Sequence, residues 1–246
     1  MNAMNLQNKT VLIVGGAAGI GQATALLCAE RGATVIVADF NETEGKATAQ
    51  AANATFVRVD VTDEASVAAM CASIAQTHGK IDALVQTAGI LKGAYVNLED
   101  FEMATLRQVL DVNTVGSFLC AKHAKPLLQK GQKPAIILIS SPAAYGVSSS
   151  YAYAISKGGV SALGTTMAGK LAPEGIRVNV LFPGGINTYM KRSVIEEDAR
   201  RKGEDPQAAV DAAAQSGLGE PLGVARVLAF LVSDEADYVR GSVSTR

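Results

Sequence analysis

Short, continuous apolar runs alternate along the chain with longer stretches of helical pattern. The apolar runs are rich in β-branched residues and are bounded by glycine or polar residues, which favours strands. We expect strands at residues 10–14, 34–38, 55–59, 83–86, 135–140 and 177–182. We expect helices at about residues 20–31, 42–52, 64–78, 104–129, 153–171 and 222–231. Because these strands are apolar along their whole length, both of their faces should be buried.

The repeated strand–helix units predict an α/β fold with a doubly wound parallel sheet and helices on both faces. No internal repeat or linker divides the 246 residues, so we expect one domain over residues 1–246. Residues 191–215 interrupt the alternation with a charged, alanine-rich stretch of helical tendency. Inserted segments at the carboxyl edge of a parallel sheet often cover ligands. Residues 188–216 are therefore either a lid over a binding site or a solvated helical excursion.

A glycine-rich turn lies between the first predicted strand and the first predicted helix. Gly15 permits the tight turn, Gly19 lets the backbone approach a pyrophosphate, and Gly21 allows close packing of helix on sheet. The helix that follows would supply N–H groups and its positive dipole end to such an anion. The spacing is G-x-x-x-G-x-G, and Ala18 and Ile20 belong to the same candidate cofactor site.

Other candidate ligands stand where the predicted strands end, the edge at which open α/β sheets bind ligands. Asp39 ends the second strand, where an acid would bind the ribose hydroxyls of an adenosine and repel a 2′-phosphate. No Arg or Lys at residues 16–18 or 40–41 could receive that phosphate, which favours NAD over NADP. The same edge contributes Phe40, Asp60, Val61, Ala88 and Gly89 to the candidate cofactor site. Asp60 could instead cap the following helix.

Tyr153 and Lys157 lie four residues apart in a predicted helix and so share one of its faces. The lysine charge should lower the pKa of the tyrosine, and a tyrosine so tuned can exchange protons with an alcohol or carbonyl. The spacing alone also fits an ordinary pair on a helix surface. Asn113 lies inside a long predicted helix, where asparagine is unfavourable. Asn113 therefore either has a polar function or is a buried amide whose hydrogen bonds are satisfied within the core.

The composition excludes other classes of function. The net charge is −1 and no basic patch indicates a nucleic acid or an anionic membrane as partner. Three isolated cysteines and two histidines lack metal-ligand spacing, so we predict no metal site. The uncharged residues 10–29 are long enough to span a membrane, but the glycines at their centre predict a strand, a turn and a helix. The first nine residues lack the pattern of a signal peptide, and we expect a cytoplasmic protein.

In this order, the motifs resemble the short-chain dehydrogenase/reductase family. They are the glycine turn, Asp60-Val61, Leu-Asp-Val-Asn113, Ile-Ser-Ser141, Tyr153 with Lys157, and Asn179-x-x-x-Pro183-Gly184, and the likeness extends from residue 10 to about 241. The resemblance implies a Rossmann-like fold and hydride transfer between a nicotinamide and a secondary alcohol or ketone. It further implies that Pro183, Gly184 and Ile186 line the nicotinamide, with Thr188 nearby.

The resemblance also implies a role for each catalytic residue. Tyr153 would be the general acid/base, Lys157 would lower its pKa and hold the nicotinamide ribose, and Asn113 would anchor a water that relays protons. A serine would hydrogen-bond the substrate oxygen. The family's usual spacing to the tyrosine selects Ser140, whereas its use of the second serine after the strand selects Ser141, which we favour.

The chain departs from the family pattern at three places. Val14 replaces a common threonine, and Gln86-Thr87 replaces Asn-Asn, which suggests a paired change. The stretch after Arg240 is shorter than the family's usual last strand and tail, which often support subunit packing. We therefore expect either the homotetramer that is common in the family or a homodimer.

Together these features predict an NAD-dependent dehydrogenase acting on a secondary alcohol or ketone. An NADPH-dependent carbonyl reductase is the alternative that Asp39 opposes. A catalytically idle NAD-binding scaffold is opposed by the complete set of catalytic residues. Apolar residues within 142–151 and 188–194 predict a pocket with few charges and a neutral substrate.

Overall fold

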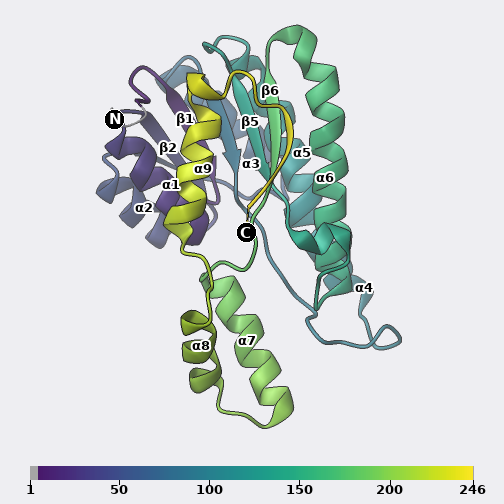
Figure 1. The fold of residues 1–246 in the computed structure, drawn as a ribbon. Helices are drawn as coiled ribbons and strands as arrows, with labels where there is room; N and C mark the ends of the chain where they lie inside the picture. Colours follow the sequence, from purple (N-terminus) through teal and green to yellow (C-terminus); the bar gives the residue numbers. More distant parts are fainter. Residues whose placement is uncertain (1–4, 246) are drawn as a thin grey trace.

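A computed structural model describes residues 5–245, and within them seven parallel strands form one sheet in the order β3-β2-β1-β4-β5-β6-β7 (Figure 1). The strands are β1 (Thr10–Val14), β2 (Thr34–Asp39), β3 (Thr55–Arg58), β4 (Ala83–Gln86), β5 (Ala135–Ile139), β6 (Arg177–Phe182) and β7 (Gly241–Ser244). The six strands predicted from the sequence are confirmed to within one residue at each end. The sequence prediction missed β7 because its four residues, Gly-Ser-Val-Ser, form no apolar run.

Helices cover both faces of the sheet (Figure 1). One face carries α1 (Gly19–Glu30), α2 (Glu42–Ala51) and α9 (Pro221–Val232), and the other carries α3 (Glu64–Thr77), α5 (Gly116–Leu128) and α6 (Tyr151–Leu171). Alternate residues of β1 enter opposite cores, with Val11 and Ile13 on the α1 side and Leu12 and Val14 on the α3 side. This double burial explains the uninterrupted apolar runs and confirms the doubly wound α/β fold.

Residues 10–29 form β1, the glycine turn and most of α1, as the sequence predicted. No helix in the described part of the chain is long and apolar enough to cross a membrane. Short 3-10 turns occur at Pro142–Tyr145, Ala172–Glu174 and Asp234–Ala236.

The helix predicted over residues 104–129 is interrupted. The structure has α4 (Met103–Leu110), a π-helical turn at Asp111–Val115 that holds Asn113, and then α5. A π turn adds one residue to the helical repeat and often occurs at functional sites. The periodicity of the sequence does not reveal such a turn, because helices on both sides keep nearly the same pattern.

Residues 188–216, expected to be a lid or a helical excursion, contain two helices, α7 (Tyr189–Lys202) and α8 (Pro206–Gln215). The two helices project together away from the sheet (Figure 1). Pro206 begins α8 rather than breaking a helix, because the first turn needs no N–H from it.

The strand order reverses between β1 and β4, so the loops after these two strands diverge and open a crevice. The backbone nitrogens of Thr87 and Ala88 donate to the oxygen of Val14 at 2.8 and 3.0 Å, which ties the two loops together.

Candidate active site

The glycine turn after β1 has no room for larger residues. Gly15 has φ +83°, and a Cβ there would lie 2.3 Å from the nitrogen of Ala88. A Cβ on Gly21 would lie 2.0 Å from the oxygen of Gly15. The helix that follows has Ala18 as its N-cap, with no side chain accepting from its first N–H groups. Gly19, Ile20 and Gly21 line the crevice, and no side chain of the described residues caps their end of the helix, which suits an anionic phosphate ligand.

A cleft of about 900 Å³ begins at this turn and crosses the carboxyl edge of the sheet. Its lining includes most of the predicted cofactor residues, namely Gly15, Ala18, Gly19, Ile20, Gly21, Asp39, Phe40, Asp60, Val61, Ala88, Gly89, Tyr153, Lys157 and Thr188. Thr188 closes the cleft over the turn, since its Cγ2 would lie 3.3 Å from a Cβ on Gly19. The shape, the glycines and the uncapped helix fit an extended dinucleotide.

Asp39 is held at one end of this cleft by two backbone donors. Its Oδ2 accepts from the nitrogen of Ala17 and its Oδ1 from the nitrogen of Asn41, both at 2.9 Å. The register of β2 and β3 places Arg58 opposite Asp39, and the guanidinium lies 4.8 Å from the ring centroid of Phe40. This cation is not predictable from the sequence, because only strand pairing brings Arg58 beside residue 40.

Asp60 does not cap α3, so of the two roles that the sequence left open, a helix cap and a cofactor ligand, the helix cap is wrong. The N-cap of α3 is Asp63, whose carboxylate accepts from the nitrogen of Ala65 at 2.9 Å. The Asp60 carboxylate instead accepts from the hydroxyl and the nitrogen of Thr62, and these hydrogen bonds lower its pKa. It lines the cleft as a charged group.

Tyr153 and Lys157 lie one turn apart in α6, where Ser150 caps the helix by accepting from the nitrogen of Tyr153 at 3.2 Å. The Lys157 Nζ lies 5.5 Å from the tyrosine ring centroid and donates to the oxygen of Ile139 at 2.8 Å. Burial lowers the pKa of Lys157 to about 8.

The pKa of Tyr153 corrects the sequence prediction. The lysine was expected to lower it, but desolvation by burial raises it, and a hydrogen bond with Ser141 offsets only part of that rise. The Lys157 ammonium lies beside the tyrosine ring and donates to a backbone carbonyl. Its charge therefore lowers the pKa of the phenol by less than the loss of water around the phenol raises it.

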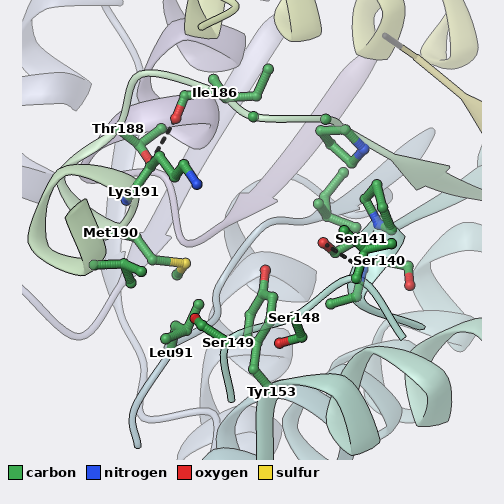
Figure 2. Close-up of a pocket in the computed structure, with 18 of the residues that line it drawn as sticks. Leu91, Ser140, Ser141, Ser148, Ser149, Tyr153, Ile186, Thr188, Met190 and Lys191 are labelled. Atoms are coloured by element: carbon green, nitrogen blue, oxygen red, sulfur yellow. Dashed lines mark hydrogen bonds between the residues drawn. The ribbon is translucent and has the colours of Figure 1, made fainter. Parts of the chain in front are cut away.

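The two serines after β5 have different surroundings. Ser140 is buried, and its Oγ donates to the backbone oxygen of Lys157 at 2.8 Å. The Ser141 Oγ accepts from the nitrogen of Ala143 at 3.2 Å, and the Ser141 hydroxyl is near enough to the Tyr153 phenol to lower its pKa. Figure 2 shows Ser141 and the tip of Tyr153 facing the same space. The geometry therefore pairs Ser141 with the tyrosine and uses Ser140 to fasten β5 to α6.

This space is a second cavity of about 280 Å³ that adjoins the first at Tyr153 (Figure 2). Pro183, Gly184, Ile186 and Thr188 line it, and of these predicted nicotinamide-lining residues Thr188 also lines the larger cleft. Val147, Met190 and Val194 form apolar wall, as expected, but Lys191 adds a charge. Tyr145, expected in this wall, stacks on Phe182 at a centroid distance of 5.4 Å instead.

A family model described as enoyl-(acyl carrier protein) reductase matches residues 15–245. The (+)-borneol dehydrogenase 1 of Salvia officinalis is 32% identical over 96% of this chain and 91% of its own. The cis-4-hydroxycyclohexanecarboxylate dehydrogenase of Sinomonas cyclohexanicum is 36% identical over 96% of this chain and 93% of its own. A solved short-chain type dehydrogenase/reductase from Mycobacterium ulcerans superposes with a TM-score of 0.86 at 26% identity, covering 98% of this chain and 89% of that one.

The chain belongs to the short-chain dehydrogenase/reductase family. It is an NAD(P)-dependent oxidoreductase that acts on alcohol or ketone groups of small molecules.

In this short-chain dehydrogenase/reductase, Asn113 lines neither cavity. Its Nδ2 donates to the oxygen of Ile90 and to the Oγ of Ser156, both at 2.9 Å, and its Oδ1 accepts from the nitrogen of Ile90 at 2.8 Å. Both amide hydrogens are thus used to hold the loop after β4 against α6. The water relay through Asn113 stays a prediction.

Thr87 explains part of the departure from the family pattern. Its hydroxyl contacts the oxygens of Val14 and Gly15 at 2.8 and 3.0 Å, so it reaches the glycine turn directly. The same hydroxyl leaves no room for a side chain on Gly21, because a Cβ there would lie 2.6 Å from the Thr87 Oγ1. The neighbouring Gln86 is buried, and its amide has no hydrogen-bond partner among the described residues.

Proposed function

We propose that the protein is an NAD-dependent dehydrogenase for a secondary alcohol or the corresponding ketone, with Tyr153 as general acid/base. One observation carries the proposal. Tyr153 lines both cavities, its phenol faces the same space as Ser141, and Lys157 lies one helical turn further along α6. A substrate oxygen in the smaller cavity would therefore contact the hydroxyls of Ser141 and Tyr153, next to the larger cleft.

The residues that line the larger cleft suit the successive parts of a dinucleotide. The uncapped start of α1 would hold the pyrophosphate, Asp39 the adenosine ribose, and Lys157 the nicotinamide ribose. Asp60, Val61, Ala88 and Gly89 would line the adenosine and central parts, and Pro183, Gly184, Ile186 and Thr188 the nicotinamide. When bound, the nicotinamide supplies or accepts the hydride.

The chain's own contribution is to orient the substrate oxygen and to move one proton. For ketone reduction, the Tyr153 phenol donates that proton. It is neutral near pH 7, because burial raises its pKa further above the ordinary value of 10.0. For alcohol oxidation, Tyr153 must first be ionised, so the oxidation rate should rise with pH. Ser141 would hold the same oxygen by a hydrogen bond.

The preference for NAD rests on Asp39, whose carboxylate is fixed by two backbone donors beside the expected ribose position. A 2′-phosphate there would be repelled by the fixed charge. Arg58 favours the alternative, an NADPH-dependent carbonyl reductase, because its guanidinium lies beside Phe40 at the same end of the cleft. Rates with the two cofactors at equal concentration distinguish these functions.

We propose that α7 and α8 act as a lid over the smaller cavity. Met190, Lys191 and Val194 of α7 already line it. The lid is tied to the loop before α6 through Tyr95, whose nitrogen donates to the oxygen of Ser149 at 2.8 Å. The Tyr95 ring lies 5.0 Å from the guanidinium carbon of Arg201.

We also propose a homodimer or homotetramer. Val115 on the π turn, Phe118 on α5, and Tyr151 and Ile155 on α6 are each between 43% and 54% exposed, and the π turn packs against both helices. Exposed apolar side chains that gather on neighbouring elements are typical of a protein–protein interface. Light scattering at micromolar concentration would give the mass, and a monomer would exclude this assembly.

The test of the proposed function is absorbance of reduced nicotinamide with a panel of secondary alcohols, including ring alcohols because one relative is named for a hydroxycyclohexane. Tyr153→Phe should lower turnover by about a hundredfold or more while NAD still binds. Tyr151→Phe is the matched control, because it removes a phenol from the same helix that lines neither cavity. Full turnover in Tyr153→Phe would refute the assigned role. NAD binding without turnover of any substrate would favour the idle scaffold.

A further inference from the structure

The smaller cavity has an uneven distribution of charge. Its wall is built from apolar residues, glycines, serines, Tyr153 and Thr188, and among the described residues that line it Lys191 is the one with a formal charge. The lysine lies in the first turn of α7, where its nitrogen donates to the Oγ of Thr188 at 3.3 Å. Figure 2 shows its side chain extending from α7 toward the space that Tyr153 and Met190 also face.

Lys191 is also the exception among the cations of α7. Arg200 pairs with Glu196 at 3.0 Å, and Arg201 and Lys202 pair with Asp198 at 2.9 and 2.6 Å. Arg192 donates to the Asn187 Oδ1 at 3.3 Å. Within residues 5–245, Lys191 is a half-buried residue whose ammonium has neither an ion pair nor a hydrogen bond.

A half-buried cation without a protein partner is best satisfied by an anion of the ligand, because attraction between opposite charges strengthens as water is excluded. The cofactor is a poor candidate for that anion. Thr188, Tyr189 and Met190 line the larger cleft, whereas Lys191 lines the smaller cavity alone.

We propose that Lys191 binds a carboxylate of the substrate, so that the substrate is a small hydroxy acid or oxo acid rather than a neutral compound. The proposal rests on the proposed function, because it assigns the reacting oxygen to Ser141 and Tyr153. One lysine balances the single charge of a carboxylate, whereas a phosphate monoester carries nearly two. The cavity of about 280 Å³ holds a small molecule whose carboxylate and reacting oxygen lie at different walls.

Binding tests this proposal without turnover. Calorimetry on the full protein saturated with NAD would compare cyclohexanecarboxylate with cyclohexanecarboxamide, which differ in charge but little in size. The acid should bind about ten- to a hundredfold more tightly than the amide, as a hydrogen bond to a charged group allows. Lys191→Met should remove this preference and Lys191→Arg should keep it. Lys202→Met, which removes the same charge from the far end of α7, is the matched control and should change nothing.

Turnover then separates this proposal from the proposed function. Hydroxycyclohexanecarboxylate and its carboxamide should differ in kcat/KM by a similar factor, and Lys191→Met should abolish the difference. An equal or better response to the amides in the wild type would overturn the carboxylate while leaving the dehydrogenase intact. A weaker affinity for NAD in Lys191→Met, with the acid preference unchanged, would assign the lysine to the cofactor and also overturn it. If no alcohol is oxidised but the acid still binds through Lys191, the proposed function fails and the anion site stands.

Discussion

Replacing Lys157 by methionine should stabilise the fold although it removes a group assigned to the active site. The Lys157 side chain is buried, and burial lowers its pKa from 10.5 to about 8. At about 1.36 kcal/mol for each pKa unit, keeping the ammonium charged here costs roughly 3 kcal/mol at pH 7. Losing the hydrogen bond to the oxygen of Ile139 costs about 1–3 kcal/mol in return. The variant should therefore gain about 1 kcal/mol in its free energy of unfolding.

The dependence on pH identifies the cause of this gain. The pKa of Lys157 is lower in the folded protein than in the unfolded chain, so between pH 8 and pH 10.5 the unfolded chain holds a proton that the folded protein has released. Wild-type stability therefore gains from this residue as pH rises, whereas below pH 8 the full cost of the buried charge applies. The advantage of Lys157→Met should shrink by about 1 kcal/mol between pH 7 and pH 9.

Urea unfolding followed by circular dichroism measures this difference, since the chain has no tryptophan. Lys170→Met serves as the control, because it removes an exposed charge near the end of the same helix. Its effect on stability should be small and flat with pH. A difference between wild type and Lys157→Met that stays constant from pH 7 to pH 9 would show that burial of the ammonium is not the cause.

Three further changes test other parts of the site. Asp39→Ser should raise the ratio of kcat/KM for NADP to that for NAD at least about tenfold, because it removes the fixed charge that opposes a 2′-phosphate; an unchanged ratio would contradict the assignment. Gly15→Ala should abolish NAD binding or lower the Tm of the protein by several degrees, because the new Cβ would lie 2.3 Å from the backbone nitrogen of Ala88. Gly169→Ala is the control and should be tolerated, because a Cβ there meets open space. Ser141→Ala should lower kcat at least about tenfold, while Ser140→Ala should largely keep it; the opposite pattern would move the role to Ser140.

Local patterns in the sequence were enough to predict the sheet, most helices and the family. Doubly buried strands must be apolar along their length, so the alternation of apolar and helical stretches marked six of the seven strands. Gly15 was predictable because a positive φ and a close backbone approach leave room for no other residue. The pairing of Tyr153 with Lys157 follows from one helical turn.

Only the tertiary structure decided the properties that depend on residues distant in the chain. Burial among several elements raises the pKa of Tyr153, opposite to what its neighbour on the helix predicted. The turn after β5 directs Ser141, not Ser140, toward Tyr153, and strand register brings Arg58 to the cofactor end of the cleft. The absence of a partner for Lys191 among the described residues appears only once α7 is packed. A sequence pattern reports spacing along one element, whereas solvent access and contacts between elements are set by how all of them pack.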